Sequence, residues 1–218
     1  MRAMGYDAVL FDLDGTLVHT APGILASFRH AFRQFGLAPD DAQLKRYLGP
    51  PLRDSFAGLL APEEVEKAVD IYRAYYAVHG QDGCHVYAGV PEMLARLRAA
   101  GYVLCVATSK ARPVAERVLR GYGLLEAFDY LGGASLDASL DTKEAVIRHV
   151  LAQPCVQGRR AVMVGDRDND MQGAAACGIN ALGARYGYAA AGELEAFAPL
   201  YLAPDVPGLE AWLLANKA

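Results

Sequence analysis

The stretch YDAVLFDLDGTLVHT, residues 6–20, holds the strongest signals of both fold and chemistry in this chain. An apolar run at residues 8–11 leads directly into Asp12 and Asp14, which are separated by one leucine and followed by a glycine and a threonine. In an extended strand, residues i and i+2 project to the same side, so the two carboxylates would lie close together and repel each other. Such a pair can also reach both ends of one reacting bond, one acid as the attacking group and the other as the proton carrier.

Two more apolar runs of strand length follow, YVLCVA at residues 102–107 and AVMVG at residues 161–165. None of the three runs alternates with polar residues, which is typical of strands buried on both faces of a parallel sheet. Helical patterns occupy residues 90–101, 111–123 and 141–153. This alternation predicts a doubly wound parallel α/β sheet with helices on both faces.

The span of residues 18–86 departs from this alternation. It contains two amphipathic helical patterns, at residues 20–36 and 62–80, and no strand candidate. Thr20 is the expected N-cap of the first pattern, with a proline in its first turn. We therefore expect an α/β core formed by residues 1–17 and 87–218, with an all-helical insertion at residues 18–86.

The composition excludes several classes of partner. The chain has 218 residues, 53% of them hydrophobic, and its 25 acidic and 21 basic residues give a formal net charge of −4. No long basic run favours a nucleic-acid polymer or an anionic membrane. Four cysteines without metal-binding spacing, and the lack of a signal-length or membrane-length apolar segment, predict a cytoplasmic protein with reduced thiols. We expect it to be a monomer or a homodimer that acts on a small molecule.

Polar residues follow all three apolar runs, and ligands of open α/β sheets bind beyond the carboxyl ends of the strands. Carboxylates that gather at such an edge raise each other's pKa. A hard divalent cation relieves that repulsion, so we expect a Mg²⁺ site here. The residues expected near this edge are Asp12, Asp14, Thr108, Ser109, Lys110, Lys143, Asp166 and Asp170.

The segments FDLDGTLV, VATSK and MVGDRDND, together with Lys143, occur in the order and at the spacing of the four motifs of the haloacid-dehalogenase-like hydrolase superfamily. The chain resembles this family over nearly its whole length, and most closely the phosphoglycolate-phosphatase-like branch. LGPPLRDSF, VYAGVPEML and YGYAAAGEL resemble the part of that branch labelled 5′-nucleotidase. The resemblance implies a Rossmann-like catalytic core, with residues 18–86 as a helical cap between the first and second motifs.

The resemblance also implies roles for the residues at the sheet edge. Asp12 matches the nucleophile that becomes an aspartyl-phosphate. Asp14 matches the acid/base residue, whose backbone carbonyl also binds Mg²⁺. Thr108 matches a hydroxyl that binds a phosphoryl oxygen, with the backbone of Ser109 beside it, and Lys143 matches the cation that offsets the phosphate charge.

Three acids in GDRDND compete for the remaining metal roles. Asp166 matches the direct Mg²⁺ ligand, and Asp170 fits a supporting role, through water or by orienting its neighbours. Asp168 is expected to stabilise a helix N-terminus instead, and the same explanation is an alternative for Asp170.

Substrate recognition is expected from the loop YLGPPLRD, residues 47–54. Tyr47 could pack against a base or a sugar, and Arg53 could bind a carboxylate or a second phosphate, while Gly49 and two prolines make the loop stiff. The alternatives are a simple interhelical turn and a solvated Arg53. His19 stands where family members often carry an aspartate, and it either faces the site or lies on the surface.

The function implied is Mg²⁺-dependent hydrolysis of a small phosphate monoester, either phosphoglycolate or a 5′-nucleotide. A sugar-phosphate mutase is the nearest alternative, because the same nucleophile could return the phosphoryl group to a sugar. A binding module of another class, a receiver-like phospho-acceptor, also uses Asp, Thr and Lys. Receivers, however, lack a cap and carry their first acids directly adjacent.

Overall fold

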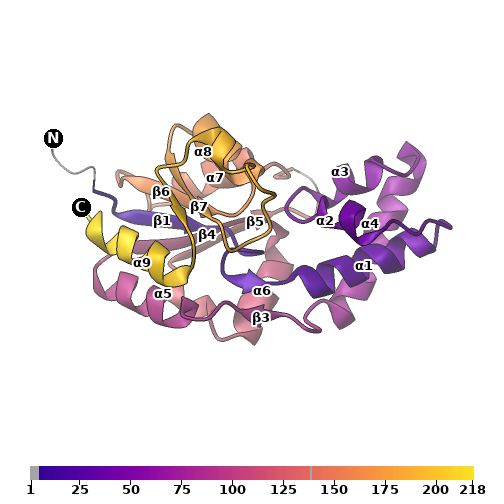
Figure 1. Ribbon diagram of the computed structural model, residues 1–218, viewed down its shortest axis with the longest axis horizontal. Helices are drawn as coiled ribbons and strands as arrows, with labels where there is room; N and C mark the ends of the chain where they lie inside the picture. The colour runs from indigo at the N-terminus through magenta and orange to yellow at the C-terminus, as the bar shows by residue number, and fades with distance from the viewer. Residues whose placement is uncertain (1–4, 138) are drawn as a thin grey trace.

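The computed structural model describes residues 5–137 and 139–218. Its centre is a parallel six-stranded sheet with the strand order β5–β4–β1–β6–β7–β8 (Figure 1). The strands are β1 (Ala8–Phe11), β4 (Val103–Ala111), β5 (Tyr130–Ala134), β6 (Ala161–Gly165), β7 (Asn180–Ala184) and β8 (Tyr201–Ala203). The expected doubly wound α/β fold is confirmed.

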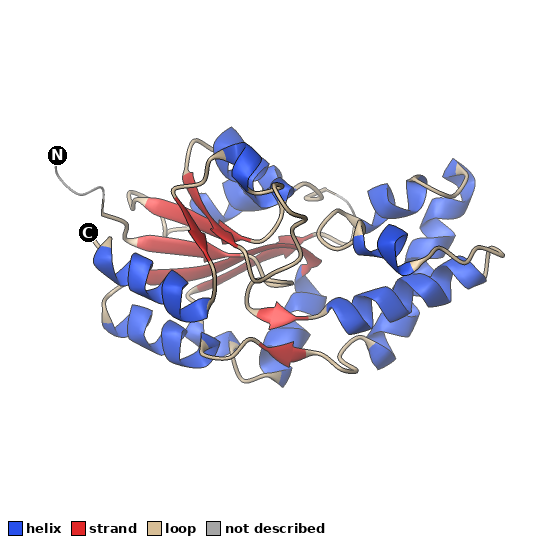
Figure 2. Ribbon diagram, in the orientation of Figure 1, coloured by secondary structure: helices blue, strands red, loops and turns tan. Residues whose placement is uncertain are grey.

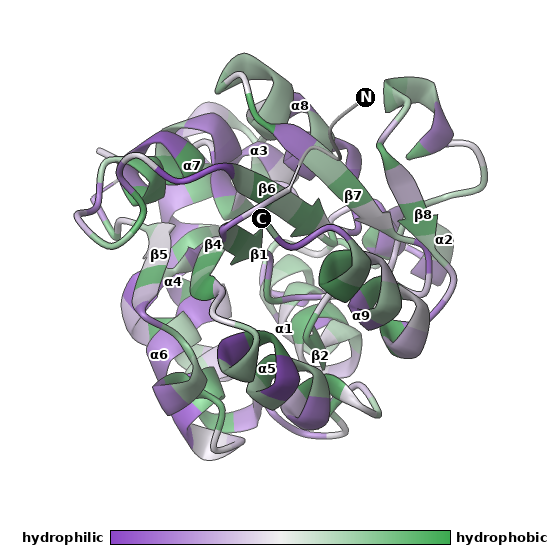
Figure 3. Cartoon of the chain, turned by 90° about the vertical axis from the view of Figure 1, so that its left-hand side faces the viewer, coloured by the Kyte–Doolittle hydropathy of each residue, from purple (hydrophilic) through white to green (hydrophobic). Residues whose placement is uncertain are grey.

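Helices cover both faces of the sheet because alternate side chains of its strands point to opposite layers. Val9 and Phe11 of β1 belong to a buried cluster with residues of three helices, and Ala8 and Leu10 belong to a second cluster on the other face. The first layer comprises α5 (Val90–Ala99), α6 (Arg112–Gly121) and α9 (Val206–Ala215), and the second α7 (Lys143–Leu151) and α8 (Asp168–Ala176). Figure 3 shows how hydrophobic the central strands β1, β4 and β6 are, as expected for strands buried on both sides.

The chain leaves the sheet after β1 and returns before α5. In this excursion β2 (Val18–His19) pairs antiparallel with β3 (His85–Val86). Between them lie four helices, here called the helical insertion: α1 (Ala21–Arg33), α2 (Asp41–Lys45), α3 (Leu52–Ala57) and α4 (Pro62–His79). Figure 2 shows these helices grouped at one end of the sheet.

The helical insertion has a buried cluster of its own, in which Phe28, Phe32, Phe56 and Tyr72 meet. The two short strands differ from the expectation of an all-helical span, because two residues each are too few to show alternation. The division into a core of residues 1–17 and 87–218 and a cap of residues 18–86 stays a prediction.

In the described ranges, no helix combines the length and the apolar character needed to cross a membrane. The cytoplasmic location and the monomeric or homodimeric state expected from the sequence stay predictions.

Candidate active site

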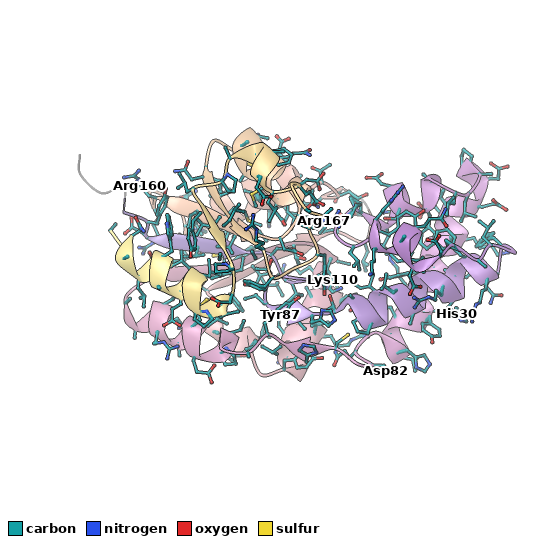
Figure 4. The ribbon with its side chains drawn as sticks, in the orientation of Figure 1. His30, Asp82, Tyr87, Lys110, Arg160 and Arg167 are labelled. Carbon is teal, nitrogen blue, oxygen red and sulfur yellow. The ribbon has the colours of Figure 1, made fainter. Side chains whose placement is uncertain are left out.

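The polar residues converge because β1 lies between β4 and β6 in the sheet. Asp12 follows β1, Thr108 lies near the end of β4, and Asp166 follows β6. A cleft of about 560 Å³ lies between the ends of β1 and β4 and the helical insertion, and Asp12 and Thr108 line it. Figure 4 shows Lys110 and Arg167 where the two parts of the molecule meet.

Lys143, at the start of α7, is buried between two acids. Its Nζ lies 2.7 Å from Oδ1 of Asp12 and 2.7 Å from Oδ1 of Asp170, and it donates to the carbonyl oxygen of Ala107 at 3.0 Å. Burial acts to lower the pKa of Lys143, but the two carboxylates outweigh it and raise that pKa. Lys143 therefore remains a fixed positive charge beside Asp12.

Asp12, Asp166 and Asp170 form a buried acidic cluster. Each brings a carboxylate oxygen to within 4.8 Å of the others. Burial, followed by the charge of Asp170, raises the pKa of Asp12 to about 6 although Lys143 opposes the shift, and burial with both neighbouring acids raises the pKa of Asp166 well above its ordinary value. One lysine cannot neutralise three carboxylates, so this donor set fits a hard divalent cation.

The three acids are not equivalent as ligands. Oδ2 of Asp170 accepts hydrogen bonds from the backbone N–H groups of Asp166 and Arg167, both at 3.0 Å, and its other oxygen pairs with Lys143. Among the described residues, Oδ1 of Asp166 has only a long contact, in which the Thr16 hydroxyl donates at 3.4 Å. Oδ1 of Asp166 is therefore the freer oxygen for binding a cation, whereas Asp170 is bound to the backbone at residues 166–167 and to Lys143.

Two glycines allow the chain to pass close to Asp166. Gly15 has φ +85, and a Cβ there would lie 2.1 Å from Oδ2 of Asp166. A Cβ on Gly187 would lie 2.3 Å from Cβ of Asp166. The turn after Asp14 is thus a close approach to Asp166 that a larger residue would block.

Both carboxylate oxygens of Asp14 are engaged. The Thr20 hydroxyl donates to Oδ1 at 2.6 Å, and Nζ of Lys110 lies 2.9 Å from Oδ2. Thr20 occupies the N-cap position of α1 as expected, but its side chain bonds to Asp14 and not to the helix. Lys110 also lies 4.6 Å from the ring centre of Tyr76 on α4.

Thr108 and Ser109 lie side by side on the cleft wall. The Thr108 hydroxyl accepts a hydrogen bond from the backbone N–H of Lys110 at 3.2 Å. The hydroxyl of Ser109 is buried and has no hydrogen-bond partner in the part of the chain that the structure describes. Buried hydroxyl groups in proteins usually have a hydrogen-bond partner, so Ser109 is a candidate to contact a ligand.

The segment of residues 47–54 reaches the site, but it is a loop only as far as Pro51, because Leu52 begins α3. Tyr47, Gly49 and Arg53 all line the cleft. Gly49 contacts the core directly, because its carbonyl accepts from Nδ2 of Asn169 at 3.1 Å. Arg53, however, is bound to Glu66 at 2.6 Å and lies 3.5 Å from Asp141.

His19 and Asp168 lie apart from the acidic cluster. The His19 ring packs 5.0 Å from that of His85 and 5.7 Å from that of Tyr188, and it does not line the cleft. Burial, followed by His85, lowers its pKa. Asp168 begins α8, and its Oδ1 accepts from the backbone N–H of Asn169 at 2.8 Å, in agreement with the helix-terminal role expected for it.

Tyr188 was not expected at the site, yet it joins Asp166 to the helical insertion. Its backbone N–H donates to Oδ2 of Asp166 at 2.7 Å, and its phenol oxygen accepts from the backbone N–H groups of Thr20 and Ala21 at 2.7 and 3.0 Å. Contacts between residues this far apart in the chain leave no local pattern. The segment YGYAAAGEL, which contains Tyr188, was recognised only by its resemblance to the 5′-nucleotidase branch, and that resemblance assigned Tyr188 no role.

This chain is similar to known proteins in both its sequence and its fold. A family model described as haloacid dehalogenase-like hydrolase matches residues 9–184. A predicted phosphatase of Clostridium acetobutylicum has the same fold, with a TM-score of 0.91 and 35% identity over 96% of this chain and 99% of that one.

Two curated relatives carry different names. The tyrosine-protein kinase PtkA of Mycobacterium tuberculosis is 42% identical over 188 residues, which are 86% of this chain, and the chain spans 65% of the kinase's length. A 5′-nucleotidase of Pseudomonas aeruginosa is 35% identical over 210 residues, and the match includes 95% of this chain and 95% of the nucleotidase.

Proposed function

This chain belongs to the haloacid dehalogenase-like hydrolase family, and we propose that it hydrolyses small phosphate monoesters, with Mg²⁺, through an aspartyl-phosphate intermediate. The observation that supports this best is the pairing of buried Lys143 with Asp12, which lines a cleft together with Asp14. A nucleophile, a fixed cation and a proton carrier are thereby within one site.

In the first half-reaction, a carboxylate oxygen of Asp12 attacks phosphorus as the bond to the leaving oxygen breaks. Asp14 donates a proton to that oxygen, and the phosphoryl group stays on Asp12. In the second, Asp14 accepts a proton from water as the water oxygen attacks phosphorus. Inorganic phosphate leaves and the Asp12 carboxylate is restored.

Charge decides whether Asp12 can approach a phosphate dianion. At ~4 Å and an effective dielectric constant near 20, each pair of unit charges repels by about 4 kcal/mol. In this proposal Lys143 offsets part of this repulsion, and the hydroxyl of Thr108 and the backbone of Ser109 bind phosphoryl oxygens. Mg²⁺ held by Asp12, Asp166 and the carbonyl of Asp14, with Asp170 orienting them, would supply further stabilisation of the transferring group.

We propose phosphoglycolate or a 5′-nucleotide as the substrate, with Tyr47, Gly49 and Arg53 close to its leaving group. The similarity to a 5′-nucleotidase over 95% of both chains supports the nucleotide. The position of these three residues in the cleft lining supports a role in recognition.

The test is phosphate release by the purified protein from phosphoglycolate, 5′-nucleotides and p-nitrophenyl phosphate, with Mg²⁺ or with EDTA. We expect turnover only with Mg²⁺, and none from an Asp12→Asn variant purified in parallel, which controls for contaminating phosphatases. Release from no substrate would contradict the hydrolase assignment, and equal rates in EDTA would contradict the role of the metal.

Phosphoryl transfer to an acceptor other than water is a second candidate, which the 42% identity to a protein named a tyrosine kinase favours. The protein would be incubated with ATP labelled at the γ-phosphate, alone and with sugar phosphates. Label on tyrosine would support a kinase, label on a sugar would support a mutase, and label only in inorganic phosphate would support the hydrolase.

A further inference from the structure

Two arginines of the cleft were not expected at the site. Arg73 on α4 and Arg117 on α6 line the same cleft as Asp12 and Asp14. They come from opposite walls, since α4 belongs to the helical insertion and α6 to a layer of the sheet. The walls meet just beyond them, because a Cβ on Gly121 at the end of α6 would lie 3.2 Å from Oε1 of Gln81.

Neither arginine forms a hydrogen bond or an ion pair within residues 5–137 and 139–218. The other cations of the cleft lining are engaged, Arg53 with Glu66 and Lys110 with Asp14. Arg73 contributes to the lowered pKa of Glu66, but that shift is caused chiefly by hydrogen bonds from Arg53, which occupy both oxygens at 2.6 and 3.1 Å. Arg73 and Arg117 are therefore the cationic groups of the cleft that remain available to a ligand.

Two residues with hydroxyl groups, Ser109 and Tyr76, also line the cleft. The Ser109 hydroxyl is buried and, within the described residues, lacks a hydrogen-bond partner, whereas the ammonium group of Lys110 lies 4.6 Å from the ring centre of Tyr76. Tyr76 is one helical turn from Arg73 on α4. Ser109 on β4 and Tyr76 on α4 thus add polar groups to the cleft lining on both of its sides.

The size and lining of the cleft favour a substrate whose leaving group fills much of the cleft. Its volume of about 560 Å³ is that of a site for a small organic molecule and exceeds what a phosphoryl group alone would fill. Phe28, Leu52 and Val114 give the cleft apolar surface. Guanidinium groups bind carboxylates and phosphates through paired hydrogen bonds.

From these observations, and resting on the proposed phosphatase function, we propose that the leaving group of the substrate carries a second anionic group, which Arg73 and Arg117 bind. The phosphoryl group lies at Asp12, an apolar or hydroxylated body spans the cleft, and a carboxylate or a second phosphate lies between α4 and α6. Arg73 and Arg117 then determine specificity without touching the reacting atoms.

The experiment compares substrates that differ only in the far group. Alkyl phosphates of increasing chain length are paired with carboxyalkyl phosphates of the same length, in which a carboxylate replaces the terminal methyl. Alkane bisphosphates form a third series, which distinguishes a phosphate from a carboxylate. The measured quantity is the preference ratio, kcat/KM for the doubly anionic substrate divided by kcat/KM for its alkyl partner.

We expect the wild-type ratio to reach about tenfold or more at the chain length that spans the cleft, through a lower KM, as for a charge-assisted hydrogen bond. Arg73→Met and Arg117→Met should each lower that ratio by about tenfold, and Arg117→Lys should restore part of it. The matched control is Arg120→Met, on the same helix as Arg117. Arg120 pairs with Glu116 at 2.7 Å, does not line the cleft, and should leave the ratio within about twofold of wild type.

A wild-type ratio near one at every chain length, while the alkyl phosphates are hydrolysed, would overturn this inference and leave the proposed function standing. An equal loss in Arg120→Met, or no loss in either arginine variant, would also overturn it. Failure of the wild type to hydrolyse any phosphate ester would contradict the proposed function itself. The wild-type ratio tests the inference even if a variant does not fold.

Discussion

The ammonium group of Lys110 lies 2.9 Å from Oδ2 of Asp14, so the proposed proton carrier is held by a cation from the neighbouring strand. Thr20 holds the other oxygen at 2.6 Å. Burial acts to lower the pKa of Lys110, but the carboxylate of Asp14 outweighs it and raises that pKa well above its ordinary value. Lys110 therefore stays charged in the range where a phosphatase works, and it keeps Asp14 in one orientation.

Replacing Lys110 should impair proton transfer more than binding. We expect Lys110→Met to lower kcat for an alkyl phosphate by roughly tenfold to a hundredfold, because the acid/base group loses its orientation. The loss for p-nitrophenyl phosphate should be smaller, since nitrophenolate leaves without a proton. Steady-state kinetics on both substrates tests this, with Lys110→Arg as the charge-conserving control. An unchanged kcat on both would remove Lys110 from catalysis.

Asp12→Asn and Asp14→Asn should impair different steps of the proposed reaction. Asp12→Asn should leave the fold intact and abolish turnover, because an amide is too poor a nucleophile. Asp14→Asn should slow both half-reactions and still accept phosphate. Acid quenching after mixing with ³²P-labelled substrate should trap labelled protein in wild type and Asp14→Asn only. Label in Asp12→Asn would place the nucleophile elsewhere.

The metal-free protein should lose stability as the pH rises toward 6. Burial, followed by the charge of Asp170, raises the pKa of Asp12 from 3.8 to about 6, so the folded state disfavours its ionised form. That contribution to the free energy of unfolding is complete below about pH 4 and lost as the pH passes 6. Its size is on the order of 2–3 kcal/mol.

Urea denaturation in EDTA from pH 4 to pH 7 measures this effect, and Asp12→Asn should flatten the decline. Added Mg²⁺ should stabilise the protein increasingly over the same range, because the cation binds ionised carboxylates. A wild-type curve in EDTA parallel to that of Asp12→Asn would show that Asp12 does not titrate there.

Gly15→Ala should damage the site beyond its backbone strain. The new Cβ would meet Oδ2 of Asp166, and φ is +85. Gly36→Ala is the matched control, because Gly36 has φ +71 and a Cβ added there would have no neighbouring atom within 4 Å. Both variants should lose about 1–2 kcal/mol of stability from the backbone, but only Gly15→Ala should also weaken Mg²⁺ activation. Equal Mg²⁺ dependence in both would show that the close approach is unimportant.

The sequence predicted those parts of the fold that depend on local pattern. The strands β1, β4 and β6 contain continuous apolar runs buried on both faces, and the polar residues at their ends meet because parallel strands end at one edge. The other strands of the sheet were not predicted, since YLGGA, NALGA and YLA are short and poor in β-branched residues.

The site was predictable where one residue type at one spacing carries the chemistry, as for Asp12 and Asp14. Arg53 was the expected cation of the recognition loop, but Glu66 is already bound to it. Arg73 and Arg117 resemble ordinary helix-surface residues in the sequence. Only the packing of α4 against the strand-end edge shows that they share a cleft with Asp12.

The central position of β1 affects how the site is assembled during synthesis. Asp12 and Lys143 are 131 residues apart in the chain, and β1 pairs with strands that begin at Val103 and Ala161. At about 5–20 residues per second, a ribosome makes that interval in roughly 7–26 seconds. Throughout that delay β1 lacks at least one of its two neighbouring strands. Its apolar residues are then exposed to aggregation, and its two acids are exposed to nonspecific cation binding. We therefore expect folding to be concerted and late, with catalytic competence and the closure of the sheet gained in the same step.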